Sequence, residues 1–176
     1  RMDGFLDPEV INAFKADFYT KYPELQEKKI ILFAPTYRGA EQKYAYYDYS
    51  KLDFQRIYEF CQKEDAVFLI KMHPFVKTLP EIPELLQDRI WEFSRFPDIN
   101  KLYYVTDLLI TDYSSNYFEY ALLQRPVVFY TYDREFYELT RGVHRSILES
   151  APGKVCDTFD QLMECLEQKD FETEKI

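Results

Sequence analysis

The sequence lacks the features of several large protein classes. Its 176 residues include only two histidines and three cysteines, and none of these has the spacing of a metal site. No apolar run approaches the roughly 18–20 residues that cross a bilayer, and no segment resembles a signal peptide. Basic residues number 22 against 31 acidic ones, and the net charge of −9 disfavours nucleic acid as a partner.

The cysteine pattern and the length indicate one reduced, folded unit. Cys61, Cys156 and Cys165 are odd in number and occupy apolar positions of periodic segments, which predicts free thiols in the core of a cytosolic protein. A chain of 176 residues can hold one domain with a substantial core, and we expect a single domain over residues 1–176. The chain opens at Arg1-Met2-Asp3 rather than at an initiator, so we expect a domain excised from a longer protein.

Continuous apolar runs predict the strands. They lie at residues 30–34, 66–70, 90–93, 108–110 and 127–130, and runs of this kind are typical of a parallel sheet covered on both faces. Helical segments lie before, between and after them. The first starts at Asp7-Pro8, and the last opens with a capping box from Thr158 to Gln161. The alternation predicts an α/β fold, a parallel sheet with helices on both faces.

The segment Thr111-Asp112-Tyr113-Ser114-Ser115 is the strongest candidate for a ligand site. It follows one predicted strand and precedes a helical pattern at 116–123, which is where parallel α/β proteins bind ligands. Hydroxyls and free backbone N–H groups at a helix start favour phosphate. The alternative is that Ser114, Ser115 or Asn116 only caps the helix, since Asn116 and Glu119 approximate a capping box.

Two other strand ends carry cationic or polar side chains. Thr36 and Arg38 follow the first strand, and a guanidinium suits bidentate contact with phosphate; the alternative is an exposed arginine in a turn. Lys71 and His73 follow the second strand. A lone histidine is more often structural, but this position at the carboxyl end of a strand favours a functional role.

These polar strand ends are expected to meet. The carboxyl ends of parallel strands lie at one edge of the sheet, so the side chains that follow four of the strands converge there. Asp133, Arg134 and Arg141 follow the strand at 127–130 as further strand-end charges, for which a solvated loop is the simpler account. The tyrosines of residues 43–50 can line a binding surface, but ordinary half-buried packing is the favoured account.

Taken in order, these motifs resemble the CDP-glycerol glycerophosphotransferases, the teichoic-acid polymerases and primases of Gram-positive bacteria. The resemblance covers nearly the whole chain. Its motifs are Ala34-Pro35-Thr36-Tyr37-Arg38, Lys71-Met72-His73-Pro74, Thr111-Asp112-Tyr113-Ser114-Ser115, and Arg125-Pro126-Val127-Val128-Phe129-Tyr130 followed by Asp133. It implies a Rossmann-like domain, the C-terminal, nucleotide-binding half of a GT-B fold. The amino-terminal acceptor domain, with the histidine that the family is thought to use as general base, would then lie outside this chain.

The resemblance implies a reaction and its participants. The parent enzyme would transfer glycerol phosphate from CDP-glycerol to a hydroxyl of a lipid-linked acceptor and release CMP. The donor would be CDP-glycerol or CDP-ribitol, and the acceptor a polyol-phosphate chain held by the other domain. No cofactor or metal is implied. The location would be cytoplasmic, with the parent enzyme peripheral at the inner face of the cell membrane, and the isolated chain would be inactive.

The resemblance also implies roles for individual side chains around the nucleotide. His73 would serve the pyrophosphate as a hydrogen-bond donor or as the acid to the CMP leaving group. The other implied roles are positive charge from Arg38 and Lys71, orientation of His73 or a ligand hydroxyl by Asp112, phosphate binding by Ser114 and Ser115, nucleotide contacts from Thr36 and Glu119, and for Arg141 either phosphate contact or stabilisation of its own loop.

Two other functions use a comparable sheet. One is a GT-B glycosyltransferase or nucleotide-sugar epimerase that takes a UDP-sugar. The Lys71-His73 and Ser114-Ser115 pairs favour the glycerophosphotransferase over this alternative. The other is a non-catalytic binding or receiver-like module. A phosphate-accepting receiver needs acidic residues after its first strand, where this chain has Pro35, Thr36 and Arg38.

Overall fold

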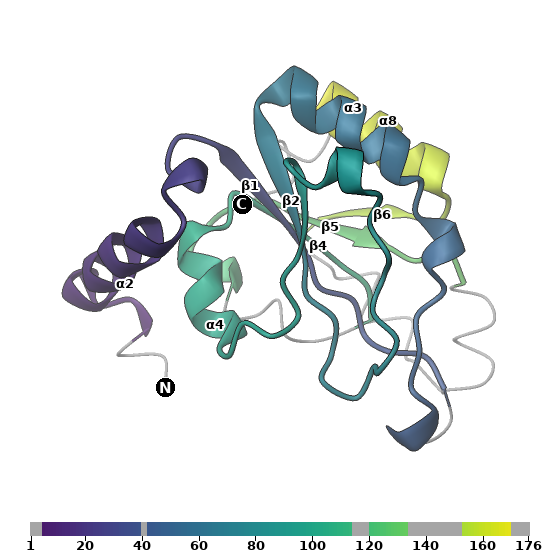
Figure 1. Cartoon of the computed structure of the whole chain (residues 1–176), viewed down its shortest axis with the longest axis horizontal. Coiled ribbons are helices and arrows are strands. Elements are labelled where there is room, and N and C mark those ends of the chain that lie inside the picture. Colours follow the sequence, from purple (N-terminus) through teal and green to yellow (C-terminus); the bar gives the residue numbers. More distant parts are fainter. Residues whose placement is uncertain (1–4, 40–41, 114–119, 134–152, 170–176) are drawn as a thin grey trace.

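A computed structural model describes residues 5–39, 42–113, 120–133 and 153–169 of the chain. Within these residues, the centre is a six-stranded sheet in which every neighbouring pair of strands is parallel (Figure 1). The strands are β1 Lys29–Phe33, β2 Ala66–Ile70, β3 Ile90–Glu92, β4 Leu108–Thr111, β5 Val127–Tyr130 and β6 Lys154–Cys156.

The strand order defines where a ligand can enter. The order across the sheet is β3-β2-β1-β4-β5-β6, so the chain moves outward from β1 to β3 and then returns to place β4 on the other side of β1. This is the order of the Rossmann doubly wound fold, and its topological switch point lies between β1 and β4. The expected fold class, a Rossmann-like parallel α/β sheet of the kind found in GT-B proteins, is confirmed.

Helices with well-formed caps connect the strands. The α-helices are α2 Pro8–Lys21, α3 Phe54–Glu64, α4 Ile99–Leu102 and α8 Phe159–Gln168, and the 3-10 turns are η1 Pro23–Leu25, η2 Gln42–Tyr44, η3 Tyr49–Lys51, η4 Glu84–Leu86 and η5 Tyr103–Val105. Asp7 caps α2 through its carboxylate, as predicted. Thr158 accepts the N–H of Gln161 and caps α8, but the Gln161 side chain returns to the N–H of Asp157.

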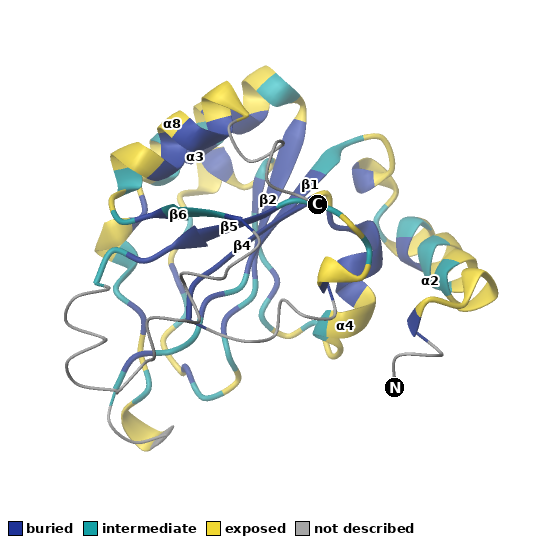
Figure 2. Ribbon diagram, turned by 180° about the vertical axis from the view of Figure 1, so that it is seen from behind, coloured by how far each residue is buried: buried dark blue, intermediate teal, exposed yellow. Residues whose placement is uncertain are grey.

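Helices cover both faces of the sheet, as predicted. Side chains alternate along β1: Ile31 and Phe33 belong to a core with α3 and α8, whereas Ile30 and Leu32 belong to a core with α2, α4 and η5. Figure 2 shows these buried inner faces beneath helices whose outer faces are exposed. Since both sides are covered, the strands need no polar alternation, and β1, β2, β4 and β5 are almost entirely buried.

The sequence-based boundaries are confirmed with small shifts, and one strand was missed. Two of the connecting segments are short: residues 84–86 form the 3-10 turn η4, and residues 99–105 form the pair α4–η5. Strand β6 has only three residues, one of them a lysine, so it carries no apolar run to announce it. Cys61, Cys156 and Cys165 are free and buried, as expected. Among the described residues, no helix is long and apolar enough to span a bilayer.

Candidate functional site at the switch point

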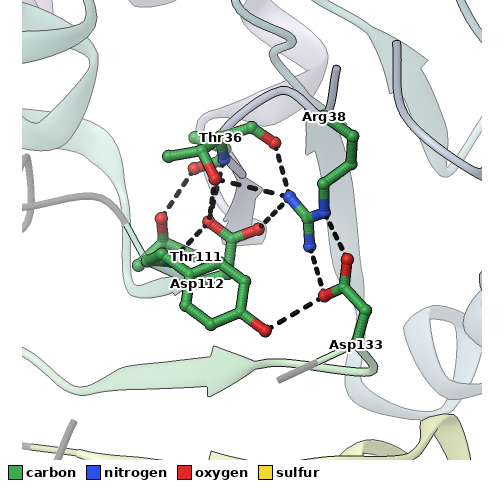
Figure 3. Close-up of polar contacts among 7 residues, drawn as sticks. Thr36, Arg38, Thr111, Asp112 and Asp133 are labelled. Atoms are coloured by element: carbon green, nitrogen blue, oxygen red, sulfur yellow. Dashed lines mark hydrogen bonds and ion pairs between the residues drawn. The ribbon is translucent and has the colours of Figure 1, made fainter. Parts of the chain in front are cut away.

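The loops that follow β1 and β4 are joined directly across the switch point. The backbone N–H and the hydroxyl of Thr36 both donate to Oδ1 of Asp112, at 2.8 and 3.0 Å (Figure 3). The hydroxyl of Thr111 donates to the carbonyl of Ala34 at 2.8 Å. Asp112 is 1% exposed, so these bonds lie under the surface of the strand-end edge. The polar residues that follow the two central strands therefore form one unit.

Arg38 is the centre of this unit. Its Nη1 donates to Oδ2 of Asp112 and to the carbonyl of Thr36, both at 2.9 Å, and its Nε and Nη2 donate to the two carboxylate oxygens of Asp133 at 2.7 and 3.0 Å. Arg38 is 4% exposed. The alternative of an exposed arginine in a turn is wrong, because the guanidinium is enclosed and divided between two carboxylates.

Aromatic rings complete the enclosure. The Cζ atom of Arg38 lies 5.1 Å from the ring centroids of Tyr47 and Tyr132 and 5.3 Å from that of Tyr113. Burial opposes the charge of Arg38, but Asp112 and Asp133 outweigh burial and raise the pKa of the guanidinium. The cation is therefore held charged and is surrounded by faces that favour a positive charge.

Opposing effects act on the pKa of Asp112. Burial raises the pKa of its carboxyl group, whereas the Arg38 charge and the hydrogen bonds from Thr36 act in the opposite direction. It also accepts the N–H of Tyr113 at 2.7 Å. Every one of these contacts uses Asp112 as an acceptor, which is the bonding pattern of the ionised form.

The loop after β1 folds back to hold Arg38 in place. Arg38 and Tyr46 exchange backbone hydrogen bonds of 2.7 and 2.9 Å, forming an isolated antiparallel bridge. Gly39 follows Arg38 with a φ of 115°, and a Cβ there would lie 2.6 Å from the carbonyl oxygen of Tyr44. Glycine is required at this position because both the backbone angle and the close approach exclude a side chain.

His73 lies after β2 with a defined tautomer. Its Nδ1 accepts the backbone N–H of Phe75 at 3.0 Å, so the proton of the neutral ring is on Nε2. The ring centroid lies 5.0 Å from that of Tyr37 and 4.4 Å from that of Phe75. Burial and then the charge of Lys71 lower the pKa of His73. A half-buried neutral imidazole that can donate from Nε2 is the result.

Lys71 points to a different part of the strand-end edge. Its Nζ donates to the backbone carbonyls of Ser94 and Phe96, in the loop that follows β3. Burial lowers the pKa of Lys71, and the charges of Glu92 and Asp98 oppose this. In this structure, the ammonium ties two strand-end loops together.

The structure thus brings together part of the predicted set. Thr36, Arg38 and Asp112 share one network, and His73 adjoins it through the Tyr37 ring. Within the described residues, the recorded partners of Asp112 are Thr36, Arg38 and Tyr113, and His73 is not among them. Four predicted residues lie outside the described ranges: Ser114, Ser115, Glu119 and Arg141.

Two participants were not in the predicted set. Asp133 was noted as a strand-end charge and in one family motif, and Tyr113 as part of another motif, but neither was assigned to the site; the Tyr113 hydroxyl donates to Oδ1 of Asp133 at 3.0 Å. The available signal was the position of Asp133 three residues after the end of β5, at the same edge of the sheet as Asp112, which directly follows β4. No cluster of three or more metal-ligating side chains occurs within the described parts of the chain.

Fold and site define a Rossmann-like α/β domain whose topological switch point, the expected ligand edge, lies between β1 and β4. The chain belongs to the CDP-Glycerol:Poly(glycerophosphate) glycerophosphotransferase family, whose model matches residues 7–176. The resemblance inferred from the motifs is therefore confirmed.

Curated relatives match the whole chain. It is 44% identical to the teichoic acid poly(ribitol-phosphate) polymerase of Bacillus spizizenii over 177 residues, which is 100% of this chain and 28% of that protein. It is 39% identical to the teichoic acid ribitol-phosphate polymerase TarL of Staphylococcus aureus, over 100% of this chain and 31% of that protein. The chain thus spans about a third of the length of these relatives.

Solved structures agree with the fold. A variant of the wall teichoic acid polymerase TagF superposes with a TM-score of 0.76 at 25% identity, covering 99% of this chain and 42% of that one. The UDP-GlcNAc 2-epimerase of Neisseria meningitidis has a TM-score of 0.57 at 16% identity, with 96% of this chain and 43% of that one covered, and this likeness concerns the fold alone.

Proposed function

We propose that this chain is the donor-nucleotide domain of a teichoic-acid polyol-phosphate transferase. The parent enzyme would have two domains, with this chain as the C-terminal half of a GT-B fold and the acceptor held by the other half. It would act in the cytoplasm at the inner face of the membrane, on a lipid-linked polyol-phosphate chain. Family membership over residues 7–176 supports the reaction class.

The observation that carries the proposal is the meeting of three motif-bearing loops at the switch point. The loops after β1 and β4 are joined through Thr36 and Asp112, and the loop after β2 adjoins them through the rings of His73 and Tyr37. In doubly wound sheets the ligand occupies the crevice outside these strand ends. Ser114 and Ser115, which continue the loop after β4, would hold phosphate there.

The relatives favour ribitol as the transferred polyol. Three relatives matched over the whole chain, at 39–44% identity, are named as ribitol-phosphate polymerases. The relatives named as glycerol-phosphate enzymes match at 32–38% identity over 79–93% of the chain. Two structures of a TagF variant come from soaks with CDPG, which supports a CDP-linked donor for the family's fold. CDP-ribitol is therefore our first choice of donor, and CDP-glycerol the second.

The proposed chemistry is an in-line phosphoryl transfer. An acceptor hydroxyl attacks the β-phosphorus, the new P–O bond forms, and the bond to the bridging oxygen breaks to release CMP. Negative charge builds on the bridging oxygen, and His73 would stabilise it by donating from Nε2. The proton of the acceptor hydroxyl would leave to a base in the other domain.

Titration calorimetry of the 176-residue chain tests the proposal. We expect CDP-ribitol, CDP-glycerol and CMP to bind, with CDP-ribitol the tightest, and UDP-N-acetylglucosamine to bind at least tenfold more weakly. Equal affinity for the cytidine and uridine compounds, or no binding of either, would contradict it. Tighter binding of CDP-glycerol than of CDP-ribitol would retain the reaction class and reverse the choice of polyol.

A further inference from the structure

Asp133 joins three strand-end loops at one point. It follows β5, and its carboxylate receives Nε and Nη2 of Arg38, which follows β1, at 2.7 and 3.0 Å. The remaining nitrogen of Arg38, Nη1, reaches Asp112 after β4 at 2.9 Å. Figure 3 shows the guanidinium between the two carboxylates. Displacing Asp133 would therefore remove the partner of Nε and Nη2 of Arg38, the cation that links the loops on both sides of the switch point.

The same carboxylate also holds the residue that precedes Ser114. Oδ1 of Asp133 accepts the hydroxyl of Tyr113 at 3.0 Å, while Oδ1 of Asp112 accepts the backbone N–H of Tyr113 at 2.7 Å. Tyr113 is 7% exposed and is fixed at its backbone by one acid and at its ring by the other. The two acids therefore fix Tyr113 together, and with it the described part of the loop that follows β4.

The charge balance argues for a positional role. Two carboxylates share one guanidinium, and the side chains of Arg38, Asp112 and Asp133 are 5%, 0% and 16% exposed. Removing charges from water at this depth is costly, so such clusters are weak sources of net stability. A buried cluster of this kind favours a single arrangement of the groups that it joins, because any misplaced partner would leave a buried charge unpaired.

We infer that Asp133 is a positioning residue that holds Arg38 and Tyr113, and with them the loops after β1 and β4, in the arrangement that binds the nucleotide diphosphate. It would do so without contacting the nucleotide. The inference rests on the proposed function, since it concerns the affinity of that same site for a diphosphate. The inference also gives Arg38 a structural role inside the site: its guanidinium pairs with the two carboxylates and does not bind phosphate directly.

Three single variants, one double variant and one control test the inference on the 176-residue chain. Asp133→Ala removes both contacts, Asp133→Asn keeps the shape and removes the charge, and Tyr113→Phe removes one hydroxyl. Asp160→Ala is the control, because Asp160 pairs with Arg56 at 2.6 Å on the helices α3 and α8 and belongs to no strand-end loop. For each protein we measure the melting temperature and the dissociation constant for CDP. The binding measurement is made at a temperature well below the melting temperature, so that the protein is folded.

We expect the dissociation constant for CDP to rise about tenfold or more in Asp133→Ala and about threefold in Tyr113→Phe, with Asp160→Ala unchanged. In the double variant of Asp133→Asn and Tyr113→Phe the two losses should not add, because both substitutions weaken one contact. A purely structural Asp133 would lower the melting temperature and leave the CDP affinity of the folded protein at the wild-type value, which would overturn the inference.

The outcomes are separable from those of the proposed function. If the wild-type chain binds no CDP, the proposed function fails and this inference fails with it. If the wild type binds CDP and Asp133→Ala binds it equally, only the positioning role is lost. Should Asp133→Ala fail to fold, Tyr113→Phe decides, since it keeps every charge of the cluster: unchanged CDP affinity in that variant overturns the role.

Discussion

The backbone N–H of Phe75 donates a hydrogen bond to Nδ1 of His73 at 3.0 Å. This contact fixes the imidazole as the Nε2–H tautomer and leaves Nε2 as a donor. The two residues are in one loop after β2, so the tautomer is set locally and does not depend on a ligand. For a site that must stabilise charge developing on a pyrophosphate oxygen, a fixed neutral donor is suited to the task.

If His73 is that donor, its removal should affect the rate far more than the fold. We expect His73→Ala to change the free energy of unfolding by about 0.5–1 kcal/mol, since the half-buried ring leaves no core cavity. In the proposed two-domain enzyme, kcat should fall by roughly 10²–10⁴. Denaturant melts and steady-state kinetics measure the two effects, and His144→Ala should alter neither.

A second substitution separates the two roles of His73. The amide nitrogen of glutamine can replace the Nε2 donor but cannot give up a proton. His73→Gln should therefore recover about tenfold of the rate lost in the alanine variant if His73 only donates a hydrogen bond. A glutamine variant as slow as alanine would make His73 a proton donor. A wild-type kcat in a folded alanine variant would end both assignments.

The lowered pKa of His73 predicts a pH dependence of stability. Burial and Lys71 hold the folded-state pKa below the usual value of 6.5, so the unfolded chain binds more protons between these two values. Stability should then decrease as pH falls through 6.5 and level off below the folded pKa, with full stability above 6.5. Protonation would also set an Nδ1–H against the N–H of Phe75.

Two measurements check this prediction. In urea melts, the free energy of unfolding of the wild type should decrease relative to His73→Gln between pH 7 and pH 5. In proton NMR, the ring of His73 should titrate below pH 6.5, with assignment from His144→Ala. A midpoint above 6.5 would show that an acid, and not Lys71, dominates the electrostatic environment of the ring.

The sheet was predictable because it is covered on both faces. Apolar runs of three to five residues predict β1, β2, β4 and β5, and alternation with helices predicts their parallel arrangement. The short edge strand β6, with Lys154 and only Val155 and Cys156 beside it, offers no such run. The place of β6 in the sheet is set by its pairing with β5, and a pairing between distant segments leaves no local pattern in the sequence.

The site was predictable as a set of strand ends but not as a set of contacts. Position after a strand identified Thr36, Arg38 and Asp112, and the structure joins them. The sequence could not show that Arg38 turns inward to Asp133, because that contact depends on how far the loops after β1 and β5 reach over the sheet. Side-chain direction after a strand is set by tertiary contacts that have no periodic signature.

The positive φ of Gly39 predicts that the loop after β1 tolerates no side chain. In Gly39→Ala, the φ of 115° and the 2.6 Å approach of a Cβ to the Tyr44 carbonyl would force the loop to move. We expect a loss of about 1–3 kcal/mol of stability, the usual cost of such backbone strain. CDP affinity should fall as well, because Arg38 is held by the adjoining bridge to Tyr46. Calorimetry and thermal melts would report both, and an unaltered melting temperature would show that the bridge adapts.

The span of the chain relative to its relatives predicts binding without turnover. It covers 28–31% of the length of two ribitol-phosphate polymerases, and in the proposed enzyme the base would lie in the other domain. With CDP-ribitol and a lipid-linked acceptor, we expect no CMP release above the rate without protein. Turnover comparable to that of a full-length relative would show that this domain alone carries the chemistry.

Two roles are possible for Lys71, a structural one and phosphate binding, and they predict different results for the same substitution. Its ammonium donates to the carbonyls of Ser94 and Phe96, so the structural account makes it a link between the loops after β2 and β3. On that account, Lys71→Met loses about 1–3 kcal/mol of stability, because two carbonyls lose a charged donor while the stem still packs. The affinity of the folded variant for CDP should then change by less than threefold.

The phosphate account of Lys71 gives the opposite result. If the ammonium leaves its carbonyls to meet the diphosphate, Lys71→Met should weaken CDP binding by tenfold or more and affect CMP less, since CMP carries one phosphate. Lys101→Met, at an exposed lysine of α4, is the matched control and should alter neither quantity. From the present geometry we expect the structural outcome: the carbonyl contacts and the lowered pKa place Lys71 in a partly desolvated position that it would have to abandon to reach a ligand.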